Sequence, residues 1–340
     1  MTDKARNFVH AALMVFFLLV PRGALQGATP GVVMDNRTGT AFLFDAETDT
    51  ITGSIPLPAN LNGSGDCVML GDRGPAFVTD FGFRLWGLDF EVSPPRLDTI
   101  SNPIRISNPG EDIAVNQNAK YLVVCDGNGA APVSVVDLAT RREASSFPLG
   151  ADCNSVDVCA DGSVLVTSYT QDFVRRLMLD ATGHLTDTGE RLTVTRPMNV
   201  YCAPGAATGL VVNQGSAVRS FSVPGLTELS AHSLDTIGLT VVFSPDAHRI
   251  FVRDGASVNA FTYDAAGGQI GADPLLHIDT DSAIGYFGME QMAIDPSGAK
   301  LYVPSYLGNL KVYSTSSGAL LKEISFPENT AHNGICLPKG

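Results

Sequence analysis

Residues 293–326 read AIDPSGAKLYVPSYLGNLKVYSTSSGALLKEISF. A short apolar run leads into Asp295-Pro296-Ser297-Gly298, and the next apolar run ends at the small polar residue Ser305. Pro, Ser, Asp and Gly in this arrangement are typical of tight hairpin turns. A further run then precedes a last one, which extends from Leu320 to Phe326. The stretch therefore predicts four short antiparallel strands in succession, here named A to D in chain order.

The pattern that ends strand B at Ser305 occurs seven times: two or three apolar residues are followed by a small polar one. The seven polar positions are Asp35, Asp80, Asp126, Ser168, Asn213, Asp254 and Ser305. They are separated by 45, 46, 42, 45, 41 and 51 residues. A four-stranded propeller blade has a period of about 40–50 residues. We therefore expect seven blades.

The first and last units complement each other. Residues 31–57 supply strands B, C and D but no strand A, whereas residues 333–340 match a strand A with its turn and then stop. A C-terminal segment that completes the first blade removes an open sheet edge and closes the ring. The sequence thus predicts an all-β, single-domain, seven-bladed β-propeller of four-stranded antiparallel blades over residues 29–340.

The first 28 residues have the features of a signal peptide. Lys4 and Arg6 precede the apolar run Phe8–Val20, which ends at Pro21 and Arg22. A run of this length is too short for a membrane-spanning helix but suits a signal peptide. We expect an exported protein, periplasmic or extracellular, that does not span the membrane once residues 1–28 are removed.

The composition argues against several classes of function. The formal net charge is −13 and charged residues make up 17% of the chain, with no basic run of the kind that binds nucleic acid. The six cysteines include no C-x-x-C motif and no Cys/His cluster at zinc spacing. We therefore predict no nucleic-acid partner, no metal and no cofactor. The expected partner is a small molecule or an extracytoplasmic protein.

Residues 293–326 resemble the repeat of the YVTN β-propellers, since Tyr302-Val303-Pro304-Ser305 partly matches the tetrapeptide that names the family. The resemblance extends over the chain after residue 28. It implies a propeller fold and a wider superfamily that includes binding proteins, lactonases, lactonizing cycloisomerases and the large subunits of amine dehydrogenases. No motif specific to one of these enzymes is present from which catalytic residues could be transferred.

In a propeller, ligands bind at the mouth of the channel, where the B–C loops and the loops from strand D to the next strand A meet. Small polar residues end all seven B strands, so we interpret them as caps of their own turns rather than as ligand groups. Polar residues that the repeat does not require are the better candidates. Those at the starts of the A strands are Asp66, Glu111, Asp112, Asp152, Asn154, Arg196, Asn199, Tyr286, Glu290 and His332.

From these positions, and from the residues at and near the B–C turns, which include Arg37, Arg84, Arg253 and Tyr306, we name a candidate site. His332 and Glu290 are the candidate catalytic bases, because a histidine titrates near neutral pH and a carboxylate can accept a proton. The candidate ligand-binding residues are Arg196, Arg253, Tyr306, Asp254, Tyr286 and Asn154. The 51-residue spacing between Asp254 and Ser305 indicates an insertion that includes 278–288, either a lid over the mouth or a longer surface loop.

Export makes disulfides possible. Cys125 ends strand B of the third blade and Cys153 leads into the fourth blade on the same face, so these two are the expected pair. Cys159, Cys202 and Cys336 fall in A strands, where cysteine packs as a small apolar residue.

Two functions remain open. The first is a binding or interaction protein with a ligand site at the channel mouth. The alternative is a small-molecule enzyme, a lactonase, cycloisomerase or lyase, that uses the same site. An enzyme should bring an acid or base, an arginine and an aromatic residue into one pocket. An electron-transfer role like that of an amine dehydrogenase subunit is a weaker third possibility.

Overall fold

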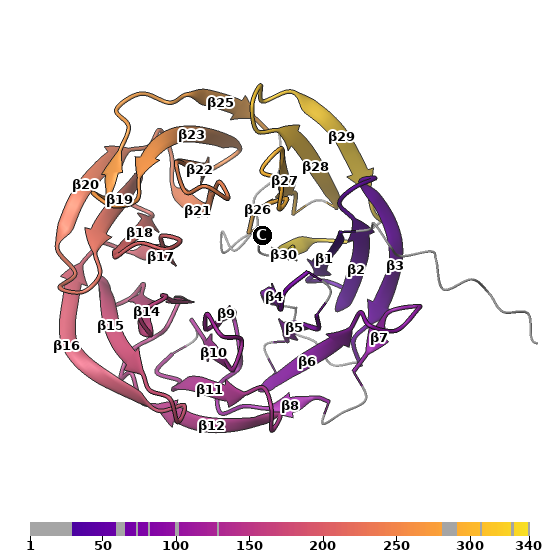
Figure 1. Cartoon of the computed structure of the whole chain (residues 1–340), viewed down its shortest axis with the longest axis horizontal. Coiled ribbons are helices and arrows are strands. Elements are labelled where there is room, and N and C mark those ends of the chain that lie inside the picture. Colours follow the sequence, from indigo (N-terminus) through magenta and orange to yellow (C-terminus); the bar gives the residue numbers. More distant parts are fainter. Residues whose placement is uncertain are drawn as a thin grey trace, which may run out of the picture.

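Seven antiparallel sheets surround a central channel in the computed structural model (Figure 1). The structure describes residues 29–58, 65–72, 74–80, 82–98, 102–127, 129–280, 291–306, 308–327 and 330–338. These residues are all-β, and none of them belongs to a helix long and apolar enough to cross a membrane. The expected seven-bladed β-propeller is confirmed.

Each blade runs from an inner strand A at the channel to an outer strand D. From the inside out, blade 1 consists of β30 (His332–Cys336), β1 (Pro30–Asp35), β2 (Thr40–Asp45) and β3 (Thr50–Pro56). Blade 2 consists of β4 (Cys67–Met69), β5 (Ala76–Thr79) and β6 (Arg84–Asp89), with β7 (Arg96–Leu97) and β8 (Ile104–Arg105) outside. Blade 3 consists of β9 (Asp112–Val115), β10 (Tyr121–Cys125), β11 (Val133–Asp137) and β12 (Arg142–Phe147).

The remaining blades follow the same order. Blade 4 consists of β13 (Ser155–Val158), β14 (Ser163–Ser168), β15 (Phe173–Leu179) and β16 (Leu185–Thr193), and blade 5 consists of β17 (Pro197–Cys202), β18 (Thr208–Asn213), β19 (Ala217–Ser222) and β20 (Glu228–Ser233). Blade 6 consists of β21 (Gly238–Phe243), β22 (Arg249–Asp254) and β23 (Ser257–Asp264), with β24 (Gln269–Ile270) and β25 (Leu276–Asp279) outside. Blade 7 consists of β26 (Ala293–Ile294), β27 (Lys300–Pro304), β28 (Asn309–Ser314) and β29 (Leu320–Ser325).

The end of the chain closes the ring. β30 pairs antiparallel with β1, with Val32 opposite Cys336 and Val33 opposite Ile335, and so becomes strand A of the first blade. β30 lies beside β4 and β26 around the channel in Figure 1. The predicted complementation of the first blade by the C-terminal segment is therefore confirmed.

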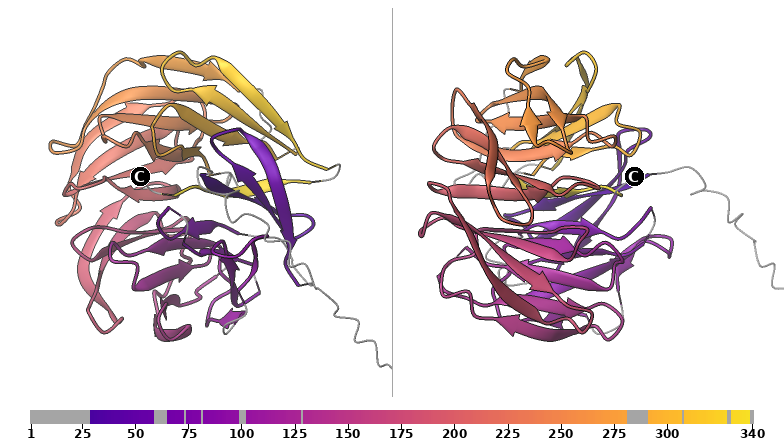
Figure 2. Two further views of the ribbon diagram at one scale, coloured as in Figure 1. Left: turned by 45° about the vertical axis from the view of Figure 1, so that its right-hand side comes forward. Right: turned by 60° about the vertical axis from the view of Figure 1, so that its left-hand side comes forward.

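The core lies between the blades because side chains alternate along each strand. In β10, Val123 and Cys125 pack with residues of blade 4, whereas Leu122 and Val124 pack with residues of blade 2. Every blade thus shares one apolar layer with each neighbour. The views in Figure 2 show the blades stacked side by side around the ring in this way.

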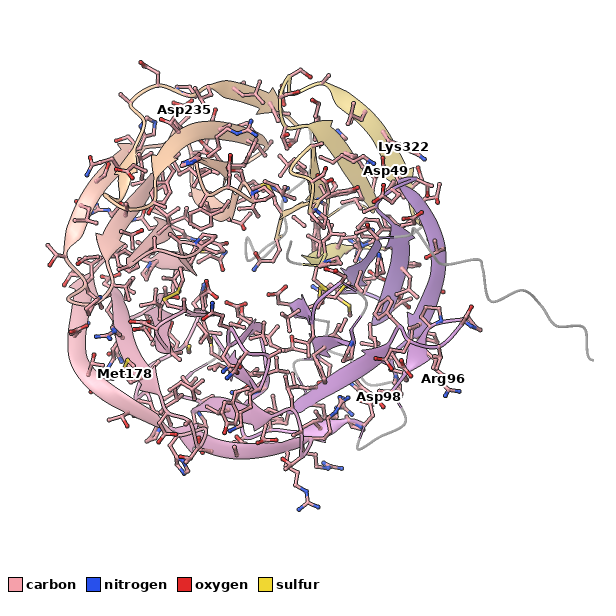
Figure 3. The ribbon with its side chains drawn as sticks, in the orientation of Figure 1. Asp49, Arg96, Asp98, Met178, Asp235 and Lys322 are labelled. Carbon is pink, nitrogen blue, oxygen red and sulfur yellow. A yellow bond between two sulfur atoms is a disulfide. The ribbon has the colours of Figure 1, made fainter. Side chains whose placement is uncertain are left out.

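Ion pairs join neighbouring blades further from the channel. Arg141 of blade 3 lies 2.6 Å from Asp98 of blade 2, and Lys300 of blade 7 lies 2.8 Å from Asp49 of blade 1. Figure 3 labels both carboxylates, which lie well outside the channel. The Asp49 contact spans the point where the first and last blades meet.

The disulfides differ from the expected pairing. Cys67 is bonded to Cys336 and Cys159 to Cys202, while Cys125 and Cys153 are free and buried. The predicted Cys125–Cys153 bond is therefore wrong. The thiol of Cys125 instead donates a hydrogen bond to the carbonyl oxygen of Cys153 at 2.8 Å.

Both observed bonds join adjacent blades at their A strands: Cys67 in β4 to Cys336 in β30, and Cys159, directly after β13, to Cys202 in β17. A strands converge at the channel, so cysteines at matching heights come within bonding reach, with Cα–Cα distances of 5.8 and 5.2 Å.

Candidate functional site in the central channel

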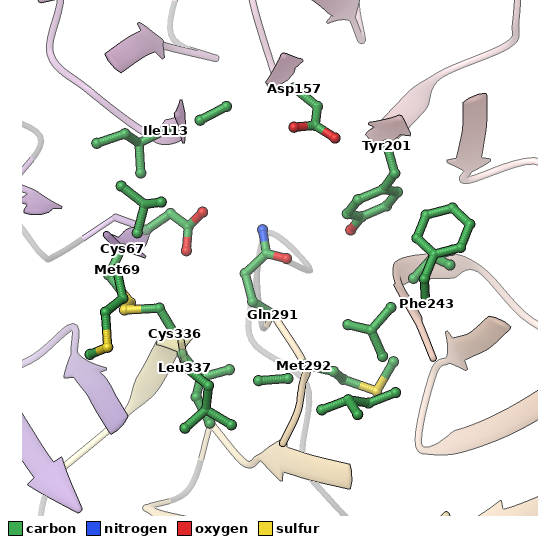
Figure 4. Close-up of a pocket in the computed structure, with 18 of the residues that line it drawn as sticks. Cys67, Met69, Ile113, Asp157, Tyr201, Phe243, Gln291, Met292, Cys336 and Leu337 are labelled. Atoms are coloured by element: carbon green, nitrogen blue, oxygen red, sulfur yellow. A yellow bond between two sulfur atoms is a disulfide. The ribbon is translucent and has the colours of Figure 1, made fainter. Parts of the chain in front are cut away.

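The central channel encloses a cavity of about 440 Å³. Residues of the A strands and of the turns that follow them line it, from all seven blades. Ligand pockets in proteins commonly have volumes of about 300–1,000 Å³. The cavity is therefore large enough for a small organic molecule (Figure 4).

A ring of polar side chains surrounds the upper end of this cavity, here the end where the A strands begin. The ring residues are Asp66, Asp112, Ser155, Asn199, Thr240 and Gln291, one from each of blades 2 to 7. Blade 1 has Gly334 there, and a Cβ at this glycine would lie 3.0 Å from the carbonyl oxygen of Gly65. The backbone of β30 thus approaches blade 2 too closely for a side chain.

The ring residues connect each blade to the next. Val156 donates its backbone N–H to Asp112 Oδ2 at 2.8 Å, and Val200 donates its own to Ser155 Oγ at 3.2 Å. The side chain of Asn199 donates to the carbonyl oxygen of Leu239 at 2.5 Å. These hydrogen bonds satisfy strand A groups that have no sheet partner on the channel side. Part of the ring is therefore structural.

Asp66 and Asp112 form a carboxyl pair in the ring. Both carboxyl groups line the cavity, and burial raises the pKa of Asp112 above its ordinary value.

A second group of polar side chains lies one level deeper. Asp157 Oδ2 accepts the backbone N–H of Cys202 at 2.8 Å, and Asp157 Oδ1 accepts that of Val158 at the same distance. The hydroxyl of Tyr201 lies 2.7 Å from Thr240 Oγ1. In Figure 4 the side chains of Asp157, Tyr201 and Gln291 point toward the middle of the cavity.

The rest of the wall is apolar and comes largely from blades 5, 6, 7 and 1. Phe243, Met292 and Leu337 belong to this part of the wall, and Leu337 lies near the Cys67–Cys336 disulfide in Figure 4. The turns after the A strands of these four blades contribute prolines to the lining, at 204, 245, 296 and 338. The cavity therefore has an acidic side on blades 2 to 4 and an apolar side opposite.

Glu111 lies next to the ring in a strongly acidic environment. Burial raises its pKa to about 8, with the charges of Asp126, Asp112 and Asp152 acting in the same direction. The backbone N–H of Gly127 donates to Glu111 Oε2 at 2.6 Å and opposes this shift. Glu111 is therefore largely protonated at neutral pH.

The cavity has no compensating positive charge in the described part of the chain. Its described lining residues include the carboxylates Asp66, Asp112, Asp157 and Asp295 but no lysine, arginine or histidine. Asp295 caps its own turn through the backbone N–H of Lys300, at 2.6 Å. Among the described residues, no three His, Cys, Asp or Glu side chains are grouped so as to hold a metal ion.

Of the polar residues at the ends of the B strands, Asp35 caps its own turn as expected, whereas Asp254 holds the loop before strand A of its blade. Asp35 accepts the backbone N–H groups of Arg37 and Thr38, each at 3.1 Å. Asp254, one of the candidate ligand residues, accepts those of Asp235 and Thr236 at 3.0 and 2.9 Å. These carboxylates therefore hold loops at the mouth.

Of the candidate bases and arginines, the structure describes His332, Arg196 and Arg253, and none of these three lines the cavity. His332 is fully buried beside the rings of Phe42 and Phe326, and Arg253 is fully buried with Nη1 3.0 Å from the carbonyl oxygen of Pro304. Neither residue lines the cavity. Arg196 is exposed, with its guanidinium 6.0 Å from the ring centre of Tyr169.

The other candidates are dispersed as well. Asn154 donates to the carbonyl oxygen of Met198 at 2.7 Å, and Tyr306 packs under the guanidinium of Arg37 at 5.6 Å. Tyr286 and Glu290 lie outside the described residues, as does most of the insertion 278–288. The part that is described belongs to β25, which pairs with β23 at the rim.

Sequence reasoning singled out Asp66, Glu111, Asp112 and Asn199 as irregular positions but did not rank them as a site. Asp157, Tyr201 and Gln291 were not named. Aligning the A strands, as was done for the B strands, gives Gln291 a polar position that recurs in successive blades, whereas Asp157 and Tyr201 share a position that is apolar in the other blades and so carry no repeat signal.

Comparisons with known proteins identify the fold. No protein-family model matches the sequence, and a search of curated proteins gives no match. A functionally unknown protein from Desulfotomaculum acetoxidans superposes with a TM-score of 0.83 at 21% identity, covering 91% of this chain and 99% of that one. At this identity the likeness shows the propeller fold alone.

Two further structures carry lactonase descriptions. A periplasmic gluconolactonase from Pseudomonas aeruginosa has a TM-score of 0.72 at 15% identity, covering 91% of this chain and 99% of that one. A putative 6-phosphogluconolactonase from Bacteroides fragilis has a TM-score of 0.70 at 17% identity, covering 92% and 98%. The chain is thus a seven-bladed propeller with lactonase-like structural neighbours.

Proposed function

We propose that this protein is an extracytoplasmic binding protein that holds a small molecule in its central channel. The observation that supports this most directly is the cavity of about 440 Å³, which has polar side chains on one side and apolar ones on the other. Pockets that are mostly apolar with a few convergent polar groups are the usual form of ligand sites. Asp157, Tyr201 and Gln291 are those convergent groups here.

The location outside the cytoplasm is supported by two disulfides, Cys67–Cys336 and Cys159–Cys202. Disulfides persist in oxidising compartments and are rare in the cytosol. The signal-like segment 1–28 agrees with this, although it lies outside the described residues.

Binding is favoured over catalysis because the polar groups expected of an enzyme are not gathered in the cavity. The lining has acids and an aromatic residue, but no arginine among its described residues, and the B-strand carboxylates are occupied by turns. This is the arrangement expected of a scaffold that binds rather than reacts.

The test blocks the channel. Gln291 projects into the cavity, so Gln291→Trp should fill it. We expect a thermal-shift screen of sugars, lactones, carboxylic acids and amines to give a ligand that raises the Tm of the wild type but not of this variant. Gln269→Trp, on the exposed outer strand β24, is the matched control and should respond like the wild type. A shift that persists in Gln291→Trp would contradict a channel site.

A second candidate function is lactone hydrolysis, which the two carboxyl groups of Asp66 and Asp112 in the cavity wall favour. One of them, as a carboxylate, would take a proton from water as the water oxygen bonds to the acyl carbon. The other, as a carboxylic acid, would give its proton to the ring oxygen as the acyl C–O bond breaks. Ring opening of gluconolactone above the spontaneous rate, reduced at least tenfold by Asp112→Asn, would establish this activity.

A further inference from the structure

The chemistry of the cavity wall indicates the class of ligand. Acceptor groups dominate the polar side, since the carboxyl groups of Asp66, Asp112 and Asp157 line it. No lysine, arginine or histidine among the described lining residues balances them. An anionic ligand would be repelled here, whereas a cation would be stabilised by partly desolvated carboxylates.

The carboxylate of Asp157 has unused acceptor capacity. Each of its oxygens accepts one backbone N–H, from Val158 and from Cys202. An ionised carboxylate has about four lone-pair sites, so further donors can bind on the side that faces the cavity. Figure 4 shows this side directed at open space between Tyr201 and Gln291.

The opposite wall suits an apolar body of limited size. Met292 and Leu337, from blades 7 and 1, lie across the cavity from Asp157, and Phe243 of blade 6 lies at the side beyond Tyr201. Burying hydrocarbon against such a surface is favourable. The ring of Tyr201 adds an aromatic surface of the kind that attracts organic cations.

We propose, on the basis of the channel site proposed above, that the ligand is a small organic cation: a protonated amine whose N–H groups donate to Asp157 and the Asp66–Asp112 pair, with its apolar body against Phe243, Met292 and Leu337. Ammonium and carboxylate then compensate each other in a partly buried site. The lactones suggested by the structural neighbours lack the positive charge that this wall favours.

Three probes of one shape test the proposal: benzylammonium, benzyl alcohol and benzoate, titrated into the wild-type protein by calorimetry at pH 7. We expect benzylammonium to bind with a Kd in the millimolar range or tighter, at least tenfold tighter than benzyl alcohol, with no measurable binding of benzoate. If the alcohol or benzoate binds as tightly as benzylammonium or more tightly, the proposal is overturned. All three titrations use the wild-type protein, so the result does not depend on whether a variant folds.

Two matched substitutions locate the cation. Asp157→Asn retains one oxygen for a backbone N–H but removes the charge, and should weaken benzylammonium binding about tenfold or more. Asp273→Asn removes the same charge at an exposed position outside the cavity and should leave the Kd unchanged. Equal weakening by both, or by neither, places the cation elsewhere and overturns the proposal.

The outcomes separate this inference from the proposed function. If a sugar or lactone raises the Tm of the wild type but not of Gln291→Trp, while benzylammonium does not bind, the channel site stands and the cation is wrong. If no probe of any class binds, both are wrong.

Discussion

Cys67 and Cys336 are 269 residues apart in the sequence, yet a disulfide joins them across the seam of the ring. Cys336 lies in β30, the strand that the end of the chain contributes to blade 1, and Cys67 lies in β4 of blade 2. β30 is therefore held to blade 1 by its pairing with β1 and to blade 2 by the disulfide. It also forms part of the cavity wall.

The two disulfides should differ in their effect on stability. In the chain-entropy model a cross-link stabilises more when it closes a longer loop, and the loops here span 269 and 43 residues. Replacing Cys67 and Cys336 by serine should lower the free energy of unfolding by about 1.5 kcal/mol more than replacing Cys159 and Cys202. Urea denaturation of both double variants measures this. The reverse order would show that ring closure does not depend on the first bond.

The close approach of β30 to blade 2 predicts a strong effect of a single methyl group. A Cβ at Gly334 would lie 3.0 Å from Gly65 O and 3.2 Å from Asp66 Cα, both backbone atoms. Gly334→Ala should therefore destabilise the fold by about 1–3 kcal/mol. Gly53→Ala in β3, where the nearest atom is a Leu43 methyl at 3.8 Å, should be neutral or slightly stabilising. Equal Tm values for the two variants would contradict the tight seam.

The fold could be predicted from the sequence because it depends on repetition. The same strand B ending recurs seven times, so the register from Asp35 to Ser305 could be read without knowing any contact. Residues 31–57 supply no strand A for the first blade, and residues 333–340 supply a strand A that no later blade uses. Pairing these two segments predicts a closed ring. The structure agrees at each of these points.

The candidate site depends on which side chains of different blades face each other, and that was harder to predict. His332 and Arg253 were chosen for their chemistry, but the alternation along their strands buries both away from the cavity. The same limitation affected the cysteines. Pairing Cys125 with Cys153 followed chain order, whereas the bonds formed join A strands that are neighbours around the channel.

Burial of Glu111 predicts that stability falls as pH rises. Its pKa is about 8 in the folded protein, against an ordinary value of 4.5, so between these values the folded state binds more protons than the unfolded state. The stabilisation is complete below about pH 4.5 and is lost as pH rises through 8, by at most about 1.4 kcal/mol per pH unit. Glu111→Gln should flatten the decrease in unfolding free energy between pH 5 and 8. An unchanged slope would mean that Glu111 is ionised in the folded protein.

Burial of His332 predicts the opposite slope in a lower window. Desolvation lowers its pKa to about 4 from 6.5, so between these values the unfolded state binds the extra proton and stability rises with pH. The contribution is present above about pH 6.5 and is lost as pH falls through 4. His332→Phe, which keeps an aromatic ring beside Phe42 and Phe326, should remove this slope. Unfolding free energies of wild type and variant at pH 4 to 7 measure it. If the slope persists in His332→Phe, another group is responsible for it, and the histidine is not held neutral by burial.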